Sequence, residues 1–218
     1  TPKGEIKNNT TLKLVDDIEV VRRYLKIERW IVVGGSWGAT LALAYGQAHT
    51  DRVEAMILRA LFLGTKKEIE WAFFDAPLKF RPELIYRLND FLNNKTLINP
   101  IFALGKMLEN KNQKIRTLGA SLWLAYESNL STIQFDYNTF NEVLSNSGKK
   151  KKILPNTPFL EWHYIKNNFF LKPNQLLKHK KKLSNIKISI IQSDYDLLCP
   201  PQTSFNFASG SSNCNVIR

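Results

Sequence analysis

The spacing of hydrophobic and polar residues changes several times along the first quarter of the chain. Residues 16–25 place apolar side chains at helical spacing, with acidic residues early and basic residues late, as the helix dipole favours. Residues 29–33 form an almost wholly apolar run that ends in Gly34-Gly35, and residues 39–45 resume a helical pattern. This pattern predicts a helix, a strand, a tight turn and a second helix, in that order.

Two further apolar runs predict strands of the same sheet. Residues 53–58 and 186–191 are aliphatic or β-branched at nearly every position, which is typical of parallel strands covered on both faces. The sequence between these two runs has helical spacing and many aromatic residues, without strong strand alternation. The sequence therefore predicts an α/β fold whose parallel sheet is interrupted by a helical cap. The expected divisions are residues 1–64 for the first part of the core, 65–183 for the cap and 184–218 for the second, incomplete part of the core.

Basic residues are in excess, which raises the question of a nucleic-acid or membrane partner. The chain has 31 Lys and Arg against 19 Asp and Glu, a formal net charge of +12. Residues 149–187 hold 11 lysines against one acid, Glu161, and so carry most of this surplus. A nucleic-acid interface would need arginines and stacking aromatics on the same face. The nearly pure lysine pattern therefore favours solvated cap loops. No apolar run approaches the roughly 20 residues of a membrane span, and neither partner is expected.

The cysteines and the chain ends also limit the possibilities. Cys199 and Cys214 form neither a CxxC motif nor a ligand cluster, so we predict no metal site, no cofactor and no disulfide framework, and a reducing compartment such as the cytoplasm. The chain begins at Thr1 without an initiator Met or a secretory leader. We expect it to be part of a longer protein.

The pentapeptide Gly34-Gly35-Ser36-Trp37-Gly38 satisfies G-x-S-x-G at the junction of a predicted strand and a predicted helix. A nucleophile elbow needs that context, because the turn is so sharp that residues beside the serine must be small. The pattern predicts Ser36 as a nucleophile and the backbone N–H of Trp37 as an oxyanion donor. The alternative is a glycine-rich turn with a bystander serine.

A serine nucleophile of this fold is followed along the chain by an acid and then by a histidine. Asp194 and Asp196 both lie just past the strand predicted at 186–191, and either could be the acid. The three histidines, His49, His163 and His179, all precede Asp196. None of them has the expected order, so the base is missing from the predicted triad.

Five segments of the chain carry a resemblance to a known family. They are Leu14–Glu19, Gly34–Tyr45, Leu58–Phe62, Glu70-Trp71 and Tyr195–Pro200. Together they resemble proline iminopeptidase, a serine aminopeptidase of the α/β-hydrolase fold. The resemblance implies a cytoplasmic enzyme that releases N-terminal proline from peptides without a metal.

The resemblance also implies roles for individual residues. Ser36 matches the nucleophile, and Asp196, rather than Asp194, matches the triad acid. Two further matches are Glu127 and Glu161, which in the family hold the amino end of the substrate. The positions of the pocket wall are Arg59 and Phe62.

The chain departs from the family in several places. Ala72 stands where an aromatic residue is expected, and Ser193-Asp194 replaces Gly-Arg. The family's His-Gly-Gly-Pro-Gly and Gly-His-Ser segments would lie before Thr1 and after Arg218. The resemblance therefore implies a chain truncated at both ends and without its catalytic histidine.

The two cap glutamates also have a physical rationale. A prolyl N-terminus is a secondary ammonium with two N–H donors, and moving it into an aromatic pocket is costly unless negative acceptors meet both. Glu127 and Glu161 would answer that need. Two alternatives stay open: a serine esterase or amidase of the same fold, which has no use for these glutamates, and an inactive or nucleic-acid-binding chain.

Overall fold

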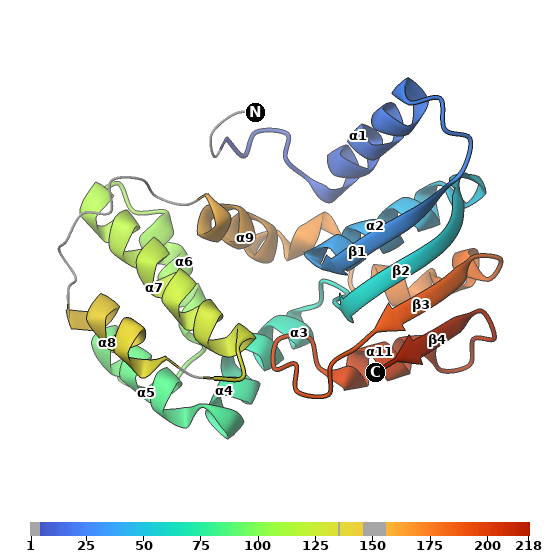
Figure 1. Ribbon diagram of the computed structural model, residues 1–218. Helices are drawn as coiled ribbons and strands as arrows, with labels where there is room; N and C mark the ends of the chain where they lie inside the picture. Colours follow the sequence, from blue (N-terminus) through green and yellow to red (C-terminus); the bar gives the residue numbers. More distant parts are fainter. Residues whose placement is uncertain (1–4, 135, 146–155) are drawn as a thin grey trace. The chain divides into compact units, whose positions relative to one another are not determined.

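A computed structural model describes residues 5–134, 136–145 and 156–218 of the chain (Figure 1). The described residues belong to two compact units. The sheet unit consists of Lys7–Glu68 and Asn167–Arg218, and the helical unit consists of Ile69–Lys166 together with Glu5 and Ile6.

Four parallel strands form the sheet of the sheet unit. Their order is β1 (Trp30–Ser36), β2 (Val53–Leu61), β3 (Lys187–Ile191) and β4 (Cys214–Ile217). Val33 lies opposite Ile57, Ile57 opposite Ser189, and Ser189 opposite Asn215. The parallel sheet and the three expected strands are confirmed. The fourth strand was not predicted, because four residues that are half polar give too short a pattern.

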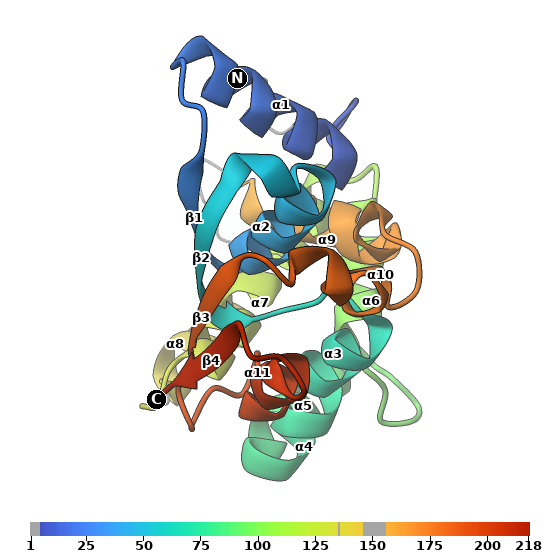
Figure 2. The same cartoon turned by 90° about the vertical axis from the view of Figure 1, so that its right-hand side faces the viewer.

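Helices cover one face of this sheet, as Figure 2 shows for α2, α10 and α11. The helices of the unit are α1 (Thr11–Tyr24), α2 (Trp37–Ala48), α10 (Gln175–Lys178) and α11 (Pro201–Ala208). Short 3₁₀ turns occupy Thr50–Arg52, Asn168–Phe170 and Lys180–Leu183. Leu43 from α2 and Phe207 from α11 are buried in one cluster with Leu58 of β2 and Ile190 of β3. Burial of apolar area in this cluster supplies the main stabilisation of the unit.

The opposite face of the sheet carries exposed apolar side chains. Val33 is 71% exposed and Ile31 55% exposed, both on β1. Ile57, Ile191 and Ile217 of the next three strands are also exposed. The strands therefore alternate between buried and exposed positions, although their apolar sequences are typical of strands covered on both faces. The described helices cover one face only.

The polypeptide leaves the sheet after β2 and returns to it at β3, and most of the intervening chain forms the helical unit. Its elements are α3 (Lys66–Glu70), a π-helical turn (Trp71–Asp75), α4 (Ala76–Phe80), α5 (Pro82–Phe91), α6 (Pro100–Leu108), α7 (Gln113–Ser131), α8 (Tyr137–Ser145) and α9 (Thr157–Lys166). Trp123 and Tyr126 of α7 are fully buried. The unit is shorter than the cap predicted at 65–183, because Leu176 and Leu183 pack into the core of the sheet unit.

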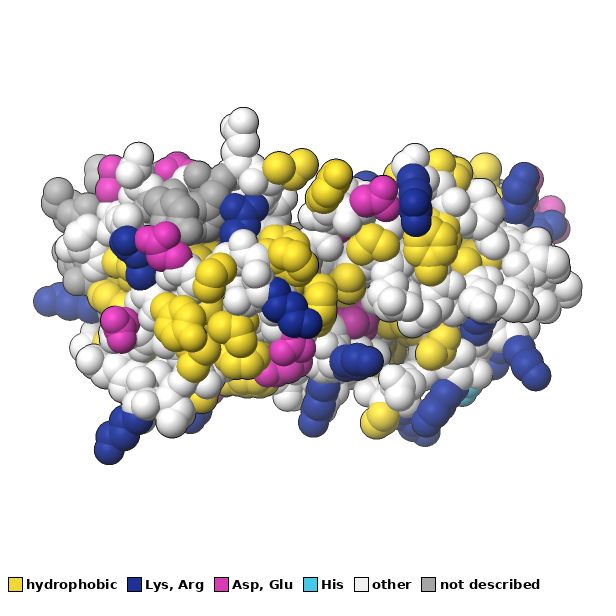
Figure 3. All heavy atoms as spheres, turned by 90° about the horizontal axis from the view of Figure 1, so that it is seen from below, with side chains coloured by type: hydrophobic (Ala, Val, Ile, Leu, Met, Phe, Trp, Pro, Cys, Tyr) yellow, Lys and Arg dark blue, Asp and Glu magenta, His cyan; other side chains and the backbone are white. Residues whose placement is uncertain are grey.

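The surface of the described residues has neither a membrane-spanning helix nor, on the face in Figure 3, a continuous basic patch. Among the described residues no helix has both the length and the apolar character needed to cross a bilayer. On the face shown in Figure 3, Lys and Arg side chains stand singly or in small groups among apolar and acidic ones in each unit. Lys149–Lys152 of the lysine-rich stretch lie outside the described residues. The absence of a nucleic-acid partner stays a prediction.

A buried polar network ties α1 and α2 to β1. The Glu19 carboxylate accepts hydrogen bonds from Arg22 Nη2 at 2.6 Å and Arg22 Nε at 2.9 Å, and from the Tyr45 hydroxyl at 3.0 Å. That hydroxyl in turn accepts from Trp30 Nε1 at 3.2 Å. The Arg22 guanidinium, which donates to Glu19, lowers the pKa of this carboxyl to about 2. One hydroxyl group therefore links a helix, a second helix and a strand.

Replacing Tyr45 by Phe tests this network. The change keeps the buried ring but leaves Trp30 Nε1 without an acceptor and Glu19 with one donor fewer, so we expect a loss of about 1–3 kcal/mol in the free energy of unfolding. Urea denaturation followed by circular dichroism measures it. The matched control is Tyr24→Phe, at a tyrosine that is 84% exposed, for which we expect a change within about 0.5 kcal/mol. Equal effects of the two changes would contradict the network's role.

Candidate active site

The strand β1 runs directly into the helix α2 at Ser36. Ser36 has φ 52° and ψ −119°, a backbone conformation that residues with a side chain rarely adopt. A Cβ atom on Gly34 would lie 2.3 Å from the carbonyl oxygen of Gly38, so the turn closes only with glycine at position 34. The turn leaves Ser36 exposed at the carboxyl end of its strand. This geometry is the one that the G-x-S-x-G context predicts for a nucleophile elbow.

Arg59 lies beside this turn on the neighbouring strand. It is the register partner of Gly35. A Cβ atom on Gly35 would lie 3.1 Å from Arg59 Nε and Nη2, so the guanidinium packs directly on the glycine. The exposed guanidinium of Arg59 therefore packs on the residue that directly precedes Ser36.

The loop after β3 brings Asp196 and Cys199 to the same edge of the sheet. Asp196 Oδ1 accepts hydrogen bonds from the backbone N–H of Leu198 at 3.0 Å and of Cys199 at 2.8 Å. The Cys199 Sγ atom lies 3.9 Å from Ser36 Oγ, at hydrogen-bonding distance for sulfur. Burial, helped by the negative charge of Asp196, raises the pKa of the Cys199 thiol to about 12. Cys199 is therefore a neutral neighbour of Ser36 and not a thiolate.

The two aspartates of this loop have different surroundings. Asp194 is exposed and forms an ion pair with Arg218 Nε at 3.4 Å. Asp196 is half-buried and held by two backbone N–H groups. Fixed orientation is what a carboxylate needs in order to hold an imidazole, so the geometry favours Asp196 over Asp194 for that task.

An aromatic cluster adjoins the elbow. The ring of Phe169 lies 5.7 Å from the ring of Trp37 and 5.0 Å, edge-on, from that of Phe62. The sequence pattern placed Phe169 in the cap, whereas the structure places it in the sheet unit. No periodicity could have located it, because Phe169 itself has φ 55° in an irregular turn.

In the helical unit, Glu127 on α7 and Glu161 on α9 lie side by side. Their carboxyl groups share a hydrogen bond, and Trp123 Nε1 donates to Glu161 Oε2 at 2.6 Å. Trp123 and Glu127 are four residues apart on α7, so both face α9. Sequence analysis found the two glutamates but not this indole donor, which the spacing of four would have indicated.

Burial and mutual repulsion change the protonation of this pair. Desolvation, followed by the negative charge of Glu127, raises the pKa of Glu161 to about 8. Desolvation also raises the pKa of Glu127. Like charges this close cannot both ionise cheaply, so near neutral pH the pair retains a proton on Glu161, which hydrogen-bonds to Glu127. It is a ready acceptor for a cation with two N–H donors.

The three histidines are divided between the two units. His49 ends α2, with its ring 5.1 Å from that of Tyr45, and His179 follows α10. Within the sheet unit as described, neither hydrogen-bonds Ser36 or Asp196. His163 belongs to α9 of the helical unit. The predicted site residues thus fall into two sets, with Glu127 and Glu161 in the helical unit and the remaining five in the sheet unit.

Comparisons with known proteins agree with this geometry. A family model described as alpha/beta hydrolase fold matches residues 1–217. A probable proline iminopeptidase of Leptolyngbya boryana is 35% identical over 201 residues, which are 92% of this chain and 61% of that relative. The proline iminopeptidase of Arabidopsis thaliana is 34% identical over 208 residues, which are 94% of this chain and 53% of that relative. The chain therefore spans little more than half the length of these relatives.

A solved structure shows the same fold. An alpha/beta fold family hydrolase from Bacillus anthracis str. Sterne aligns with a TM-score of 0.57 at 17% identity, covering 98% of this chain and 67% of that one. The resemblance to proline iminopeptidases that the sequence indicates is confirmed, and so is the α/β-hydrolase fold.

Alanine substitutions at Gly34 and Gly38 test the close approach of these two residues in the elbow. Gly34→Ala places a methyl group against the carbonyl of Gly38, so we expect about 1–3 kcal/mol of destabilisation. Gly38→Ala is the matched control, since a Cβ atom there meets nothing within 4 Å. We expect it to be neutral or slightly stabilising, because alanine is the better helix former. Thermal and urea unfolding measure both, and equal destabilisation would refute this account of the turn.

The carboxyl pair should destabilise the fold as the pH rises. Unfolded Glu161 ionises near 4.5 and folded Glu161 near 8, so the native state binds more protons and its stability falls between these values. Glu161→Gln mimics the protonated form, keeping an acceptor for Trp123 and a donor for Glu127. We expect its melting temperature to exceed that of the original protein by a margin that grows from pH 5 to pH 8. The control, Glu142→Gln, changes an exposed carboxylate; a constant difference with pH would exclude the shifted pKa.

Proposed function

The chain belongs to the α/β-hydrolase fold family, and we propose that it carries the chemistry of a proline iminopeptidase, a serine hydrolase that releases an N-terminal proline. The arrangement that carries this proposal is the half-buried, hydrogen-bonded pair of Glu127 and Glu161. The names of the relatives support the same substrate class. The proposal gives the two sets of residues two tasks, acyl transfer and recognition of the amine.

Acyl transfer is assigned to the elbow. Ser36 Oγ attacks the carbonyl carbon of the N-terminal proline, the bond to the following nitrogen breaks, and that nitrogen leaves with a proton. Water then attacks the resulting ester and frees proline and Ser36. The N–H of Trp37, at the first turn of α2, would donate to the oxyanion.

Proton transfer needs a base, and Asp196 is proposed as the partner that orients it. The two backbone hydrogen bonds at Oδ1 fix this carboxylate. Its role would be to hold an imidazole in the tautomer that accepts the Ser36 proton. His49 and His179, the histidines of the sheet unit, make no hydrogen bond to it in the described residues, so the proposal assigns the base to neither.

Recognition of the amine is assigned to the glutamates. A prolyl ammonium carries one positive charge and two N–H donors, and a cation beside Glu161 favours the ionised form of that carboxyl. Binding would therefore expel the shared proton and leave one carboxylate for each N–H. A pair with half-buried carboxyls resists ionisation until the cation arrives, which discriminates against neutral ligands. Arg59 and Phe62 are proposed as walls of the pocket.

The compartment follows from the thiols. Cys199 and Cys214 are both free, and neither forms a disulfide in the structure. Free thiols persist in a reducing environment, so we propose that the enzyme acts in the cytoplasm on peptides with N-terminal proline.

Hydrolysis of proline 4-nitroanilide and alanine 4-nitroanilide tests the proposed function. We expect kcat/KM to favour proline, and Ser36→Ala to lower turnover at least about 1,000-fold, because the substitution removes the nucleophile. Turnover that survives in Ser36→Ala, or equal rates on the two anilides, would overturn the proposal.

A second pair of variants separates an aminopeptidase from a general esterase of the same fold. Glu127→Gln and Glu161→Gln should each reduce kcat/KM on the proline anilide by about 10-fold to 100-fold, since each removes a charge-assisted hydrogen bond. Both should leave hydrolysis of 4-nitrophenyl acetate, which has no ammonium group, within about twofold. Parallel losses on the two substrates would contradict amine recognition by this pair.

A further inference from the structure

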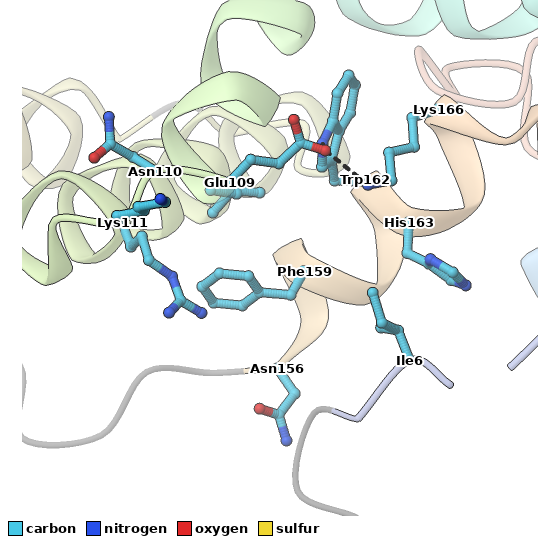
Figure 4. A pocket seen from close by; sticks show the side chains of 11 residues that line it. Ile6, Glu109, Asn110, Lys111, Asn156, Phe159, Trp162, His163 and Lys166 are labelled. Carbon is cyan, nitrogen blue, oxygen red and sulfur yellow. Dashed lines mark hydrogen bonds and ion pairs between the residues drawn. The ribbon is translucent and has the colours of Figure 1, made fainter. Parts of the chain in front are cut away.

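The helical unit contains a cavity that the proposed reaction does not use. It has a volume of about 530 Å³ and is lined by the end of α6, the start of α7 and one side of α9 (Figure 4). This volume suits a small organic molecule. In Figure 4, Phe159 projects from α9 toward the open space, and Trp162 lies beside Glu109 and Lys166.

Arg116 on α7 lines this cavity with an unused hydrogen-bond donor. Its Nε atom is buried and has no hydrogen-bond partner among the described residues. The guanidinium carbon lies 5.1 Å from the centroid of the Phe159 ring, a cation–π contact that fixes the group without satisfying its N–H. A buried donor without an acceptor destabilises the fold, and an oxygen ligand in the cavity would remove that cost.

The charges around the cavity favour an anion. Among the described lining residues, Lys111, Arg116 and Lys166 are cationic and Glu109 is anionic. Lys166 Nζ is paired with Glu109 Oε1 at 2.7 Å, so it is already neutralised. Arg116 and Lys111 remain as cations that can face a ligand, so the described lining carries a net positive charge.

The apolar walls add a second requirement. Phe159, Trp162 and Leu108 line the same space, and Trp162 is held in place by its Nε1 bond to Glu109 at 3.0 Å. A ligand that fills the cavity therefore needs an apolar body as well as a negative end. Arginine pairs with a planar carboxylate through two parallel N–H groups, whereas phosphate has no apolar body to cover these walls.

We propose that this cavity binds an organic monocarboxylate, with the carboxylate on Arg116 and the apolar body on Phe159 and Trp162. The inference does not rest on the proposed peptidase activity, since binding is measured without turnover.

Isothermal titration calorimetry with 3-phenylpropionate tests the site, with 3-phenylpropanamide as the neutral analogue of the same shape and inorganic phosphate as the competing anion. We expect saturable binding of the carboxylate and affinities at least about tenfold lower for the amide and for phosphate. Equal affinity for the amide would show that charge is not recognised. Equal affinity for phosphate would replace the carboxylate with a general anion site, and no saturable binding would refute the site.

Two substitutions on α7 locate the binding. Arg116→Gln should weaken binding of 3-phenylpropionate about tenfold or more. Lys114→Gln is the matched control, because it removes the same charge from the same helix at an exposed residue outside the lining. Equal weakening by both would mean non-specific attraction and overturn the proposal. If circular dichroism shows that Arg116→Gln is unfolded, Phe159→Leu serves instead, and unchanged affinity in that variant would also overturn it.

Discussion

The close approach of two backbone segments at the elbow governs the geometry of the sheet unit. Gly34 and the carbonyl of Gly38 come so near that no side chain fits between them. This contact forces Ser36 into a strained conformation, with φ 52°. It also lets α2 start without a linker and turn back over the sheet, where Leu43 packs into the core. The register shift between β1 and β2 at Gly35 and Ser36 is part of the same bend. Strain at one residue thus exposes a hydroxyl while the buried helix stabilises the turn.

In the helical unit the unfavourable feature is the burial of the Glu127 and Glu161 carboxyl groups. Burying two carboxyl groups together opposes folding, and nothing in the packing of α7 and α9 requires acids there. Fully buried Trp123 packs edge-on against Trp162 of α9 and also donates to Glu161. The core side chain and the polar pair are therefore coupled, so the pair is positioned by the most rigid part of the unit. Such a pair is better explained by ligand binding than by stability.

Sequence reasoning succeeded where a local rule determines the structure. The elbow at Ser36 follows from small residues at a strand-to-helix junction, and the strands follow from apolar runs. Asp196 and the glutamates required a family resemblance, because isolated acids have no local signature. The exposed face of the sheet could not be predicted, since an apolar strand looks the same whether a second layer covers it or not. The place of Phe169 beside Trp37 depends on a contact between distant segments, which no pattern along the chain records.

Two indole groups in the helical unit show how neighbours decide the charge of a carboxyl. Trp123 donates to Glu161 and Trp162 donates to Glu109, and the two rings lie 6.4 Å apart in an edge-on arrangement. The donor is the same in both cases, yet the pKa of Glu161 is raised and that of Glu109 is lowered. The difference lies in burial, which raises the pKa of Glu161, and in the third partner, which is the acid Glu127 for one and the cation Lys166 for the other. An indole N–H can orient a carboxyl group, but neighbouring charge and burial decide whether it holds a proton. Glu161 is consequently the group whose charge a bound cation can change, whereas Glu109 stays ionised and neutralises Lys166.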